Sequence, residues 1–251
     1  MNGELTCQVD QDHPVTVVRP RGVLRIGSAP ALRATVAKCL AEQPAGVLLE
    51  LSALQLGDEV ALTVFQALTR RAAEWPAVPV ALCSVPPSMY EPMARIGMAR
   101  HLQVFPGPAE ALATLAKGPS PTVLRDWYPP EAAACHQARL VVADACAAWQ
   151  VEDVSEDAVM VVNELVANAV CHAGTRFQLT VAMRGAYLCL SVRDGSAAPP
   201  VLARRPERAG GQGLVLISKL ATAWGHLSAV DGKVVWATLR TRQPGAGRNG
   251  R

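Results

Sequence analysis

A proline- and glycine-rich stretch near the middle of the chain restricts its folding more than any other feature. Residues 118–121 read Gly-Pro-Ser-Pro, and prolines recur at positions 129 and 130. Proline lacks a backbone N–H and its ring clashes with a preceding helical turn, so such a stretch sustains neither a helix nor a central strand. We therefore predict four parts with these bounds: a first domain over 13–117, a linker over 118–129, a second domain over 130–242 and a frayed tail over 243–251.

Composition and charge exclude several classes of protein. Half of the 251 residues are hydrophobic, and 24 basic residues stand against 21 acidic ones without a long block of like charge, so direct nucleic-acid binding is not indicated. We predict neither export nor a membrane span, because there is no basic and then apolar leader and no run of about 18 apolar residues. The seven cysteines are widely spaced and form no Cys-x-x-Cys pair, which is typical of buried, reduced thiols in a cytoplasmic protein.

Strand-like and helical segments alternate through the first domain. We expect strands at 15–26, 46–51, 78–84 and 102–105, and helices at 29–42, 59–74, 87–97 and 108–116. Such alternation predicts a largely parallel sheet covered by helices, which is an α/β fold.

The segment LLELSALQLGD, residues 48–58, resembles STAS domains, the fold of anti-sigma factor antagonists. Antagonists that are switched by phosphorylation carry hydroxyl-bearing residues just after this aspartate, whereas here Asp58 is followed by Glu-Val-Ala. The resemblance therefore implies a STAS-like domain without the usual phosphoacceptor. Thr63 is the nearest hydroxyl, a full turn inside the expected helix, where a kinase would reach it poorly. Glu59 is a poor copy of phosphoserine, because a carboxylate carries about one charge against about −1.5 to −2 for the phosphate.

The second domain is expected to be a helix-over-sheet sandwich of the α+β type. We expect helices at 131–149, from 155 through the segment 160–172, and from 213 to about 223, and strands at 176–184, 187–193 and 234–241. Ser155 is the expected N-cap of the middle helix, with two acidic residues after it at the positive end of the helix dipole.

The middle helix carries a polar stripe. Glu164, Asn168 and His172 follow at intervals of four, and they share one face because a helix repeats about every 3.6 residues. Two glycine-containing segments come next, Asp194-Gly195-Ser196 and Gly211-Gln212-Gly213-Leu214. Each feature alone is most often a surface pair, a hairpin turn or a loop. In this order they predict a nucleotide pocket, in which we assign His172 no catalytic role.

Residues 161–172, VVNELVANAVCH, resemble the N box of the GHKL ATPase superfamily. More narrowly, Pro130 to Arg242 resembles the anti-sigma-factor serine/threonine kinases of Gram-positive bacteria and their actinobacterial relatives, which share the GHKL (Bergerat) fold. The match includes Trp224-Gly225 and the segment 232–236. The resemblance implies ATP and Mg²⁺ as cofactors. A two-component histidine kinase is disfavoured because no dimerising helical pair with a phosphoacceptor histidine precedes Pro130.

The resemblance also implies roles for individual residues. Glu164 would be the catalytic residue, a general base that deprotonates the incoming hydroxyl, and Asn168 would bind the nucleotide by supplying an oxygen to Mg²⁺. Asp194 would accept the adenine amino proton, which separates adenine from guanine. Gly195 would let the base approach the main chain closely.

The second glycine segment would hold the phosphates. Gly211, Gly213 and Leu214 open the last expected helix, whose backbone N–H groups can bind phosphate oxygens. Arginines occur just before it, in the position of the family's ATP lid, but exposed loop arginines are usually only solvated; they are Arg204, Arg205 and Arg208.

The resemblance implies a protein serine/threonine kinase that phosphorylates a separate STAS antagonist in trans, within a partner-switching circuit that controls a sigma factor. The alternative is a non-catalytic module whose nucleotide occupancy regulates a sigma factor or an antagonist. In both cases the partners are proteins rather than nucleic acid or membrane, and a homodimer is compatible with the resemblance.

Overall fold

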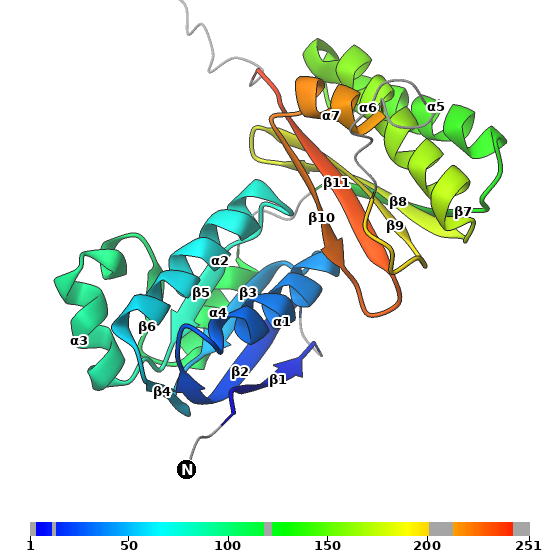
Figure 1. Cartoon of the computed structure of the whole chain (residues 1–251). Coiled ribbons are helices and arrows are strands. Elements are labelled where there is room, and N and C mark those ends of the chain that lie inside the picture. Colours follow the sequence, from blue (N-terminus) through cyan, green and yellow to red (C-terminus); the bar gives the residue numbers. More distant parts are fainter. Residues whose placement is uncertain (1–3, 12–13, 118–121, 201–212, 243–251) are drawn as a thin grey trace, which may run out of the picture. The chain divides into compact units, whose positions relative to one another are not determined.

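The computed structural model describes residues 4–11, 14–117, 122–200 and 213–242 (Figure 1). The chain divides into two compact units, Met1–Ser120 and Pro121–Arg251. Each unit has its own sheet and its own helices. Within the described part of the chain, every helix falls short of the length and apolarity that crossing a membrane requires.

The N-terminal unit is a six-stranded sheet covered by helices. Its strands and helices are β1 (Thr6–Asp10), β2 (Val15–Leu24), α1 (Ala29–Ala41), β3 (Gly46–Glu50), β4 (Leu54–Leu56), α2 (Thr63–Glu74), β5 (Val80–Cys83), α3 (Pro87–Arg95), β6 (Gln103–Phe105) and α4 (Pro108–Ala116). The strand order is β1-β2-β3-β5-β6, with β4 paired to β2, and only the β1–β2 pair is antiparallel. The expected largely parallel α/β arrangement is confirmed, whereas the sequence analysis missed β1 and β4.

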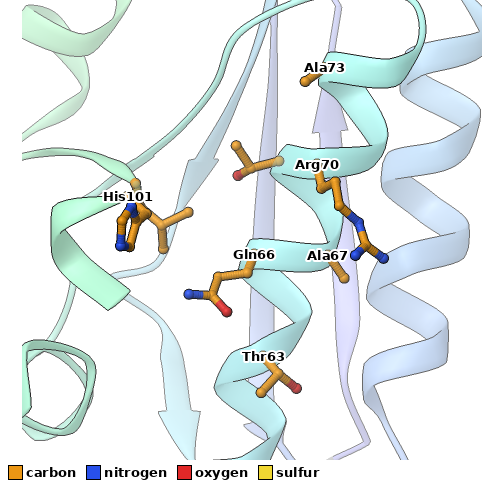
Figure 2. A pocket seen from close by; sticks show the side chains of 8 residues that line it. Thr63, Gln66, Ala67, Arg70, Ala73 and His101 are labelled. Carbon is orange, nitrogen blue, oxygen red and sulfur yellow. The ribbon is translucent and has the colours of Figure 1, made fainter. Parts of the chain in front are cut away.

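The start of α2 differs from the expected single helix over 59–74. A 3-10 turn, Glu59–Leu62, precedes the α-helix, which begins at Thr63. The Thr63 hydroxyl donates to the carbonyl of Val60 at 2.7 Å. Thr63 is nevertheless exposed, and it lines an open cavity of about 480 Å³ beside α2 together with Arg70 and His101 (Figure 2). Thr63 is therefore the first residue of α2 and does not lie a full turn inside the helix, whereas poor access of a kinase to its hydroxyl stays a prediction.

Glu59 is tied to another element of the same unit. The Nη2 atom of Arg95, the last residue of α3, donates to both carboxylate oxygens of Glu59 at 2.7 and 2.6 Å. The ion pair is largely exposed to solvent. Because Arg95 of the same unit already pairs with this carboxylate, Glu59 is not an unpaired negative charge as a surface phosphoserine would be.

The C-terminal unit is a five-stranded antiparallel sheet, and α5, α6 and α7 lie on one face of it (Figure 1). Its elements are β7 (Thr122–Tyr128), α5 (Ala133–Ala148), α6 (Ser155–Asn168), β8 (Phe177–Arg184), β9 (Tyr187–Asp194), α7 (Gly213–Leu220), β10 (Ala223–Ser228) and β11 (Lys233–Arg240). The strand order is β10-β11-β9-β8-β7. The expected helix-over-sheet sandwich is confirmed.

Two strands of this sheet lie where the sequence analysis placed none. Residues 122–128, assigned above to the linker, form β7, which pairs along its whole length with β8. The prolines flank this strand rather than interrupt it, and β7 is an edge strand, where prolines at the ends are tolerated. Residues 118–121 of the predicted linker and the predicted tail 243–251 lie outside the described residues. β10 was also missed, because the preceding helix was expected to run on to 223.

The core of the C-terminal unit lies between the sheet and its helices. Three rows of side chains cross β8, β9 and β11 on the covered face: Leu179, Val192 and Val235; Val181, Leu190 and Ala237; Met183, Leu188 and Leu239. The apolar positions of α6 between the polar residues pack onto them: Val161, Val162, Leu165 and Val166. Since successive strand residues alternate between faces, the next row on the same face consists of Phe177, Asp194 and Lys233.

All seven cysteines are free thiols. Four of them are buried, and burial raises the pKa of Cys39 to about 11 and that of Cys189 to about 12. Cys171 is exposed and departs from the expectation of buried thiols.

Close packing against a neighbouring side chain explains the glycine of the Trp224-Gly225 pair. Gly225→Ala should therefore destabilise the C-terminal unit. Gly225 lies opposite Trp236 on the neighbouring strand, and a Cβ atom at Gly225 would stand 2.9 Å from Cζ2 of that indole. Trp236 is only 1% exposed, so its ring has no room to withdraw. We expect a loss of about 1–3 kcal/mol in urea unfolding. Gly185→Asn is the control, because nothing lies within 4 Å of a Cβ there and asparagine tolerates positive φ. An equal effect of both variants would contradict this account.

Candidate functional site

The described residues of the predicted pocket lie on α6, on α7 and at the end of β9. α6 ends at Asn168, and only residues 169–176 separate it from Phe177, the first residue of β8. The end of α6 therefore lies near the end of the sheet at which the row of Phe177, Asp194 and Lys233 stands. The end of α6, the start of α7 and the neighbouring ends of β9 and β11 supply the site.

Glu164 lies against the start of α7. A Cβ atom at Gly213, the first residue of α7, would collide with the Glu164 carboxyl group and stand 3.2 Å from its Cδ. Only glycine fits there without displacing the carboxylate. Asn163 donates from Nδ2 to Oε1 of Glu164 at 3.2 Å. The carboxylate is thus held between a neighbouring amide and the amino end of a helix, where negative charge is favoured.

Asn168 is partly buried and has an unsatisfied amide. Its Nδ2 atom is buried and has no hydrogen-bond partner among the described residues. A buried polar atom without a partner is costly, and this one lies at the end of α6.

The polar stripe does not continue regularly to His172. Residues Ala169–Ala173 form a π-helical turn, closed by a hydrogen bond from Gly174 N to Ala169 O at 3.1 Å. A π turn has more residues per turn than an α-helix, so His172 departs from the line of Glu164 and Asn168. His172 is exposed.

Asp194 is buried and held from two sides. Its Oδ1 atom accepts hydrogen bonds from Lys233 Nζ at 3.0 Å and from the backbone N–H of Ser196 at 2.9 Å. No partner is recorded for Oδ2 within the described ranges. From the sequence, Lys233 was predicted only as part of the closing strand. A lysine at an inward-facing position of an otherwise apolar strand is the feature that could have predicted its contact with a buried acid.

Gly195 touches Thr175, a residue that sequence reasoning also missed. The Gly195 N–H donates to Thr175 Oγ1 at 2.9 Å, and a Cβ atom at Gly195 would lie 3.3 Å from the same oxygen. Gly232 meets the same turn from the other side, because a Cβ there would collide with the carbonyl oxygen of Asp194. The main chain after Asp194 is therefore enclosed by close contacts.

Two family models match the chain. The model of the STAS domain matches residues 6–111, and the model of the histidine kinase-like ATPase domain matches residues 128–239. The chain therefore joins a STAS domain to a histidine kinase-like ATPase domain. Comparison with curated protein sequences finds no match.

Several solved structures are similar to less than half of the chain. An anti-sigma factor antagonist from Mycobacterium paratuberculosis is 24% identical, with 45% of this chain and 95% of that chain covered and a TM-score of 0.40. The RsbU and RsbW domains of Rv1364c from Mycobacterium tuberculosis are 18% identical, with 49% of this chain and 33% of that chain covered and a TM-score of 0.39. A STAS domain protein from Planctomyces limnophilus is 21% identical, with 43% and 96% covered and a TM-score of 0.37.

The structure describes only some of the remaining predicted residues of the ATPase domain. Gly211 and the arginines at 204, 205 and 208 lie outside the described residues. Leu214 is described, and its side chain is buried in the core beneath α7. Leu214 could therefore meet a nucleotide only through its backbone N–H.

The ATPase domain implies nucleotide binding. No group of three or more His, Cys, Asp or Glu side chains that could hold a metal ion by themselves occurs among the described residues. Mg²⁺ seldom needs such a cage, because it keeps several waters and takes further oxygens from substrate phosphates. One amide oxygen from Asn168, beside a nucleotide, fits that donor pattern. Together, the STAS and ATPase domains fit regulation by partner switching.

Proposed function

We propose that the ATPase domain binds ATP with Mg²⁺ and transfers the γ-phosphoryl group to a serine or threonine of a separate STAS antagonist. The observation that carries this proposal is the contact between Glu164 and Gly213. It places a carboxylate on α6 against the amino end of α7, where a phosphate chain would be held. A general base must lie within reach of the transferred group, and this contact supports that position.

Each residue of the site then has a distinct task. Asp194 accepts the amino proton of adenine, and Gly195 keeps the main chain free of a side chain where the base stacks. Asn168 presents its amide oxygen toward the phosphates. Mg²⁺, when bound there, would neutralise phosphate charge. Glu164 takes the proton of the incoming hydroxyl, while the N–H groups at the start of α7 hold phosphate oxygens.

The acceptor is proposed to lie on another protein. Asp58 of this STAS domain is followed by Glu59, not by the serine of a switchable antagonist. Thr63 is exposed, but its hydroxyl already donates to Val60 O. A STAS antagonist with a free serine at that position is the better substrate, and the sigma factor would be the competing partner of a partner-switching circuit.

The direct test is incubation of the full chain with ATP, Mg²⁺ and purified STAS antagonists, followed by phosphopeptide mapping. The expected result is phosphate on one antagonist serine or threonine. Label on Thr63 alone would place the acceptor within this chain instead. Tight ATP binding with no label on any protein would exclude protein kinase activity. It would favour the alternative, a nucleotide-responsive module that binds a sigma factor or an antagonist without catalysis.

A further inference from the structure

We propose that Lys233 sets the base specificity of the site by fixing Asp194 as a pure hydrogen-bond acceptor, so that the pocket takes adenine and rejects guanine. The inference rests on the proposed nucleotide site and names a specificity residue within it. Lys233 acts through Asp194 and is therefore a positioning residue.

The pair is built into the core of the sheet. Lys233 and Asp194 stand opposite each other on β11 and β9, and their side chains are 6% and 1% exposed. The Nζ–Oδ1 distance is 3.0 Å, and Nζ also lies 3.5 Å from the carbonyl oxygen of Ser196. Two charges are costly to bury, and replacing such a pair by apolar residues often stabilises a protein. Its position on the covered face, beside α6, suggests a function other than stability.

The hydrogen bonds leave one oxygen of the carboxylate for a ligand. Oδ1 is occupied by the ammonium group of Lys233 and the N–H of Ser196. Oδ2 has no recorded partner in the described part of the chain. A carboxylate oxygen only accepts hydrogen bonds. Adenine presents an amino donor at the position where guanine presents a carbonyl acceptor, so Oδ2 would attract the first and repel the second.

Arg193, which precedes Asp194, lies on the opposite face of β9 and pairs there with Asp231 of the β10–β11 turn at 2.6 Å. That pairing lowers the pKa of Asp231. On the strand beside β9, Phe177 is the neighbour in register and carries no charge. Among the described residues, Lys233 is the cation that forms an ion pair with Asp194.

The test compares ATP and GTP binding by calorimetry for the full chain and for Lys233→Met. We expect the wild type to prefer ATP. In Lys233→Met the carboxylate loses the ammonium group that holds Oδ1, so Oδ2 is no longer held in place for the ligand. ATP affinity should then fall roughly tenfold while GTP affinity stays unchanged, so the preference for ATP should shrink by the same factor. Lys233→Arg should keep the preference for ATP.

Lys219→Met is the matched control, because it makes the same change at an exposed lysine of α7. If Lys233→Met fails to fold, Asp194→Asn provides the second test. Its amide can turn an N–H toward guanine, and it should lose the preference for ATP. Equal loss of ATP and GTP affinity in Lys233→Met would overturn the inference and leave the proposed function standing. A wild type that binds no ATP would overturn the proposed function as well.

Discussion

Replacing Glu164 by glutamine is expected to leave ATP binding nearly unchanged and to lower phosphoryl transfer by about a hundredfold to ten-thousandfold. Glutamine keeps the size of the side chain and its packing against Gly213, but it cannot accept the proton of an incoming hydroxyl. We expect ATP binding to stay unchanged, because a glutamine side chain can make the same van der Waals contact with Gly213 at the start of α7. Calorimetry gives the affinity for ATP, and single-turnover transfer to an antagonist gives the rate.

Glu156→Gln is the matched control, since it makes the same substitution two turns earlier on α6 at an exposed position. It should leave both measurements unchanged. If Glu164→Gln preserves transfer at the wild-type rate, Glu164 is not the base. If it preserves regulation of a partner without any transfer, the chain acts by nucleotide-dependent binding alone.

Local sequence patterns predicted the parts of the site that depend on one element. Glu164 and Asn168 lie four residues apart in a regular α-helix, and the apolar residues between them are buried as a 3.6-residue repeat requires. The alternation of strands and helices predicted the parallel sheet of the N-terminal unit for a similar reason, because each period is set by neighbouring residues.

Features that depend on pairing between distant strands could not be predicted in this way. Lys233 and Asp194 are 39 residues apart, and their contact follows from the register of β11 against β9. A shift of that register by one residue would turn Lys233 to the opposite face of the sheet. The strand β7 was missed for the same physical reason, since its residues become a strand only by pairing with β8. The π turn at Ala169–Ala173 is a further irregularity that no periodic pattern reveals.

Replacing Asn168 by leucine is expected to change stability and function in opposite directions. The Nδ2 atom of Asn168 is buried without a partner among the described residues, so an apolar side chain of similar size removes an unsatisfied group. The unliganded protein should therefore be as stable as the wild type, or more stable, in urea unfolding. The same change removes the amide oxygen proposed for Mg²⁺, and the Mg²⁺-dependent part of the ATP affinity should fall about tenfold to a hundredfold.

Asn168→Asp separates the two effects. A carboxylate keeps an oxygen for the metal and adds charge, so the Mg²⁺ dependence should persist, while a buried and unpaired charge should lower the stability of the unliganded protein. Calorimetry with ATP, in Mg²⁺ and in EDTA, measures the first effect, and urea unfolding without nucleotide measures the second. A structural amide would give the reverse result for the leucine variant: lower stability and an unaltered response to Mg²⁺. Stability gained while metal-dependent affinity is lost is the pattern of a residue kept for its ligand.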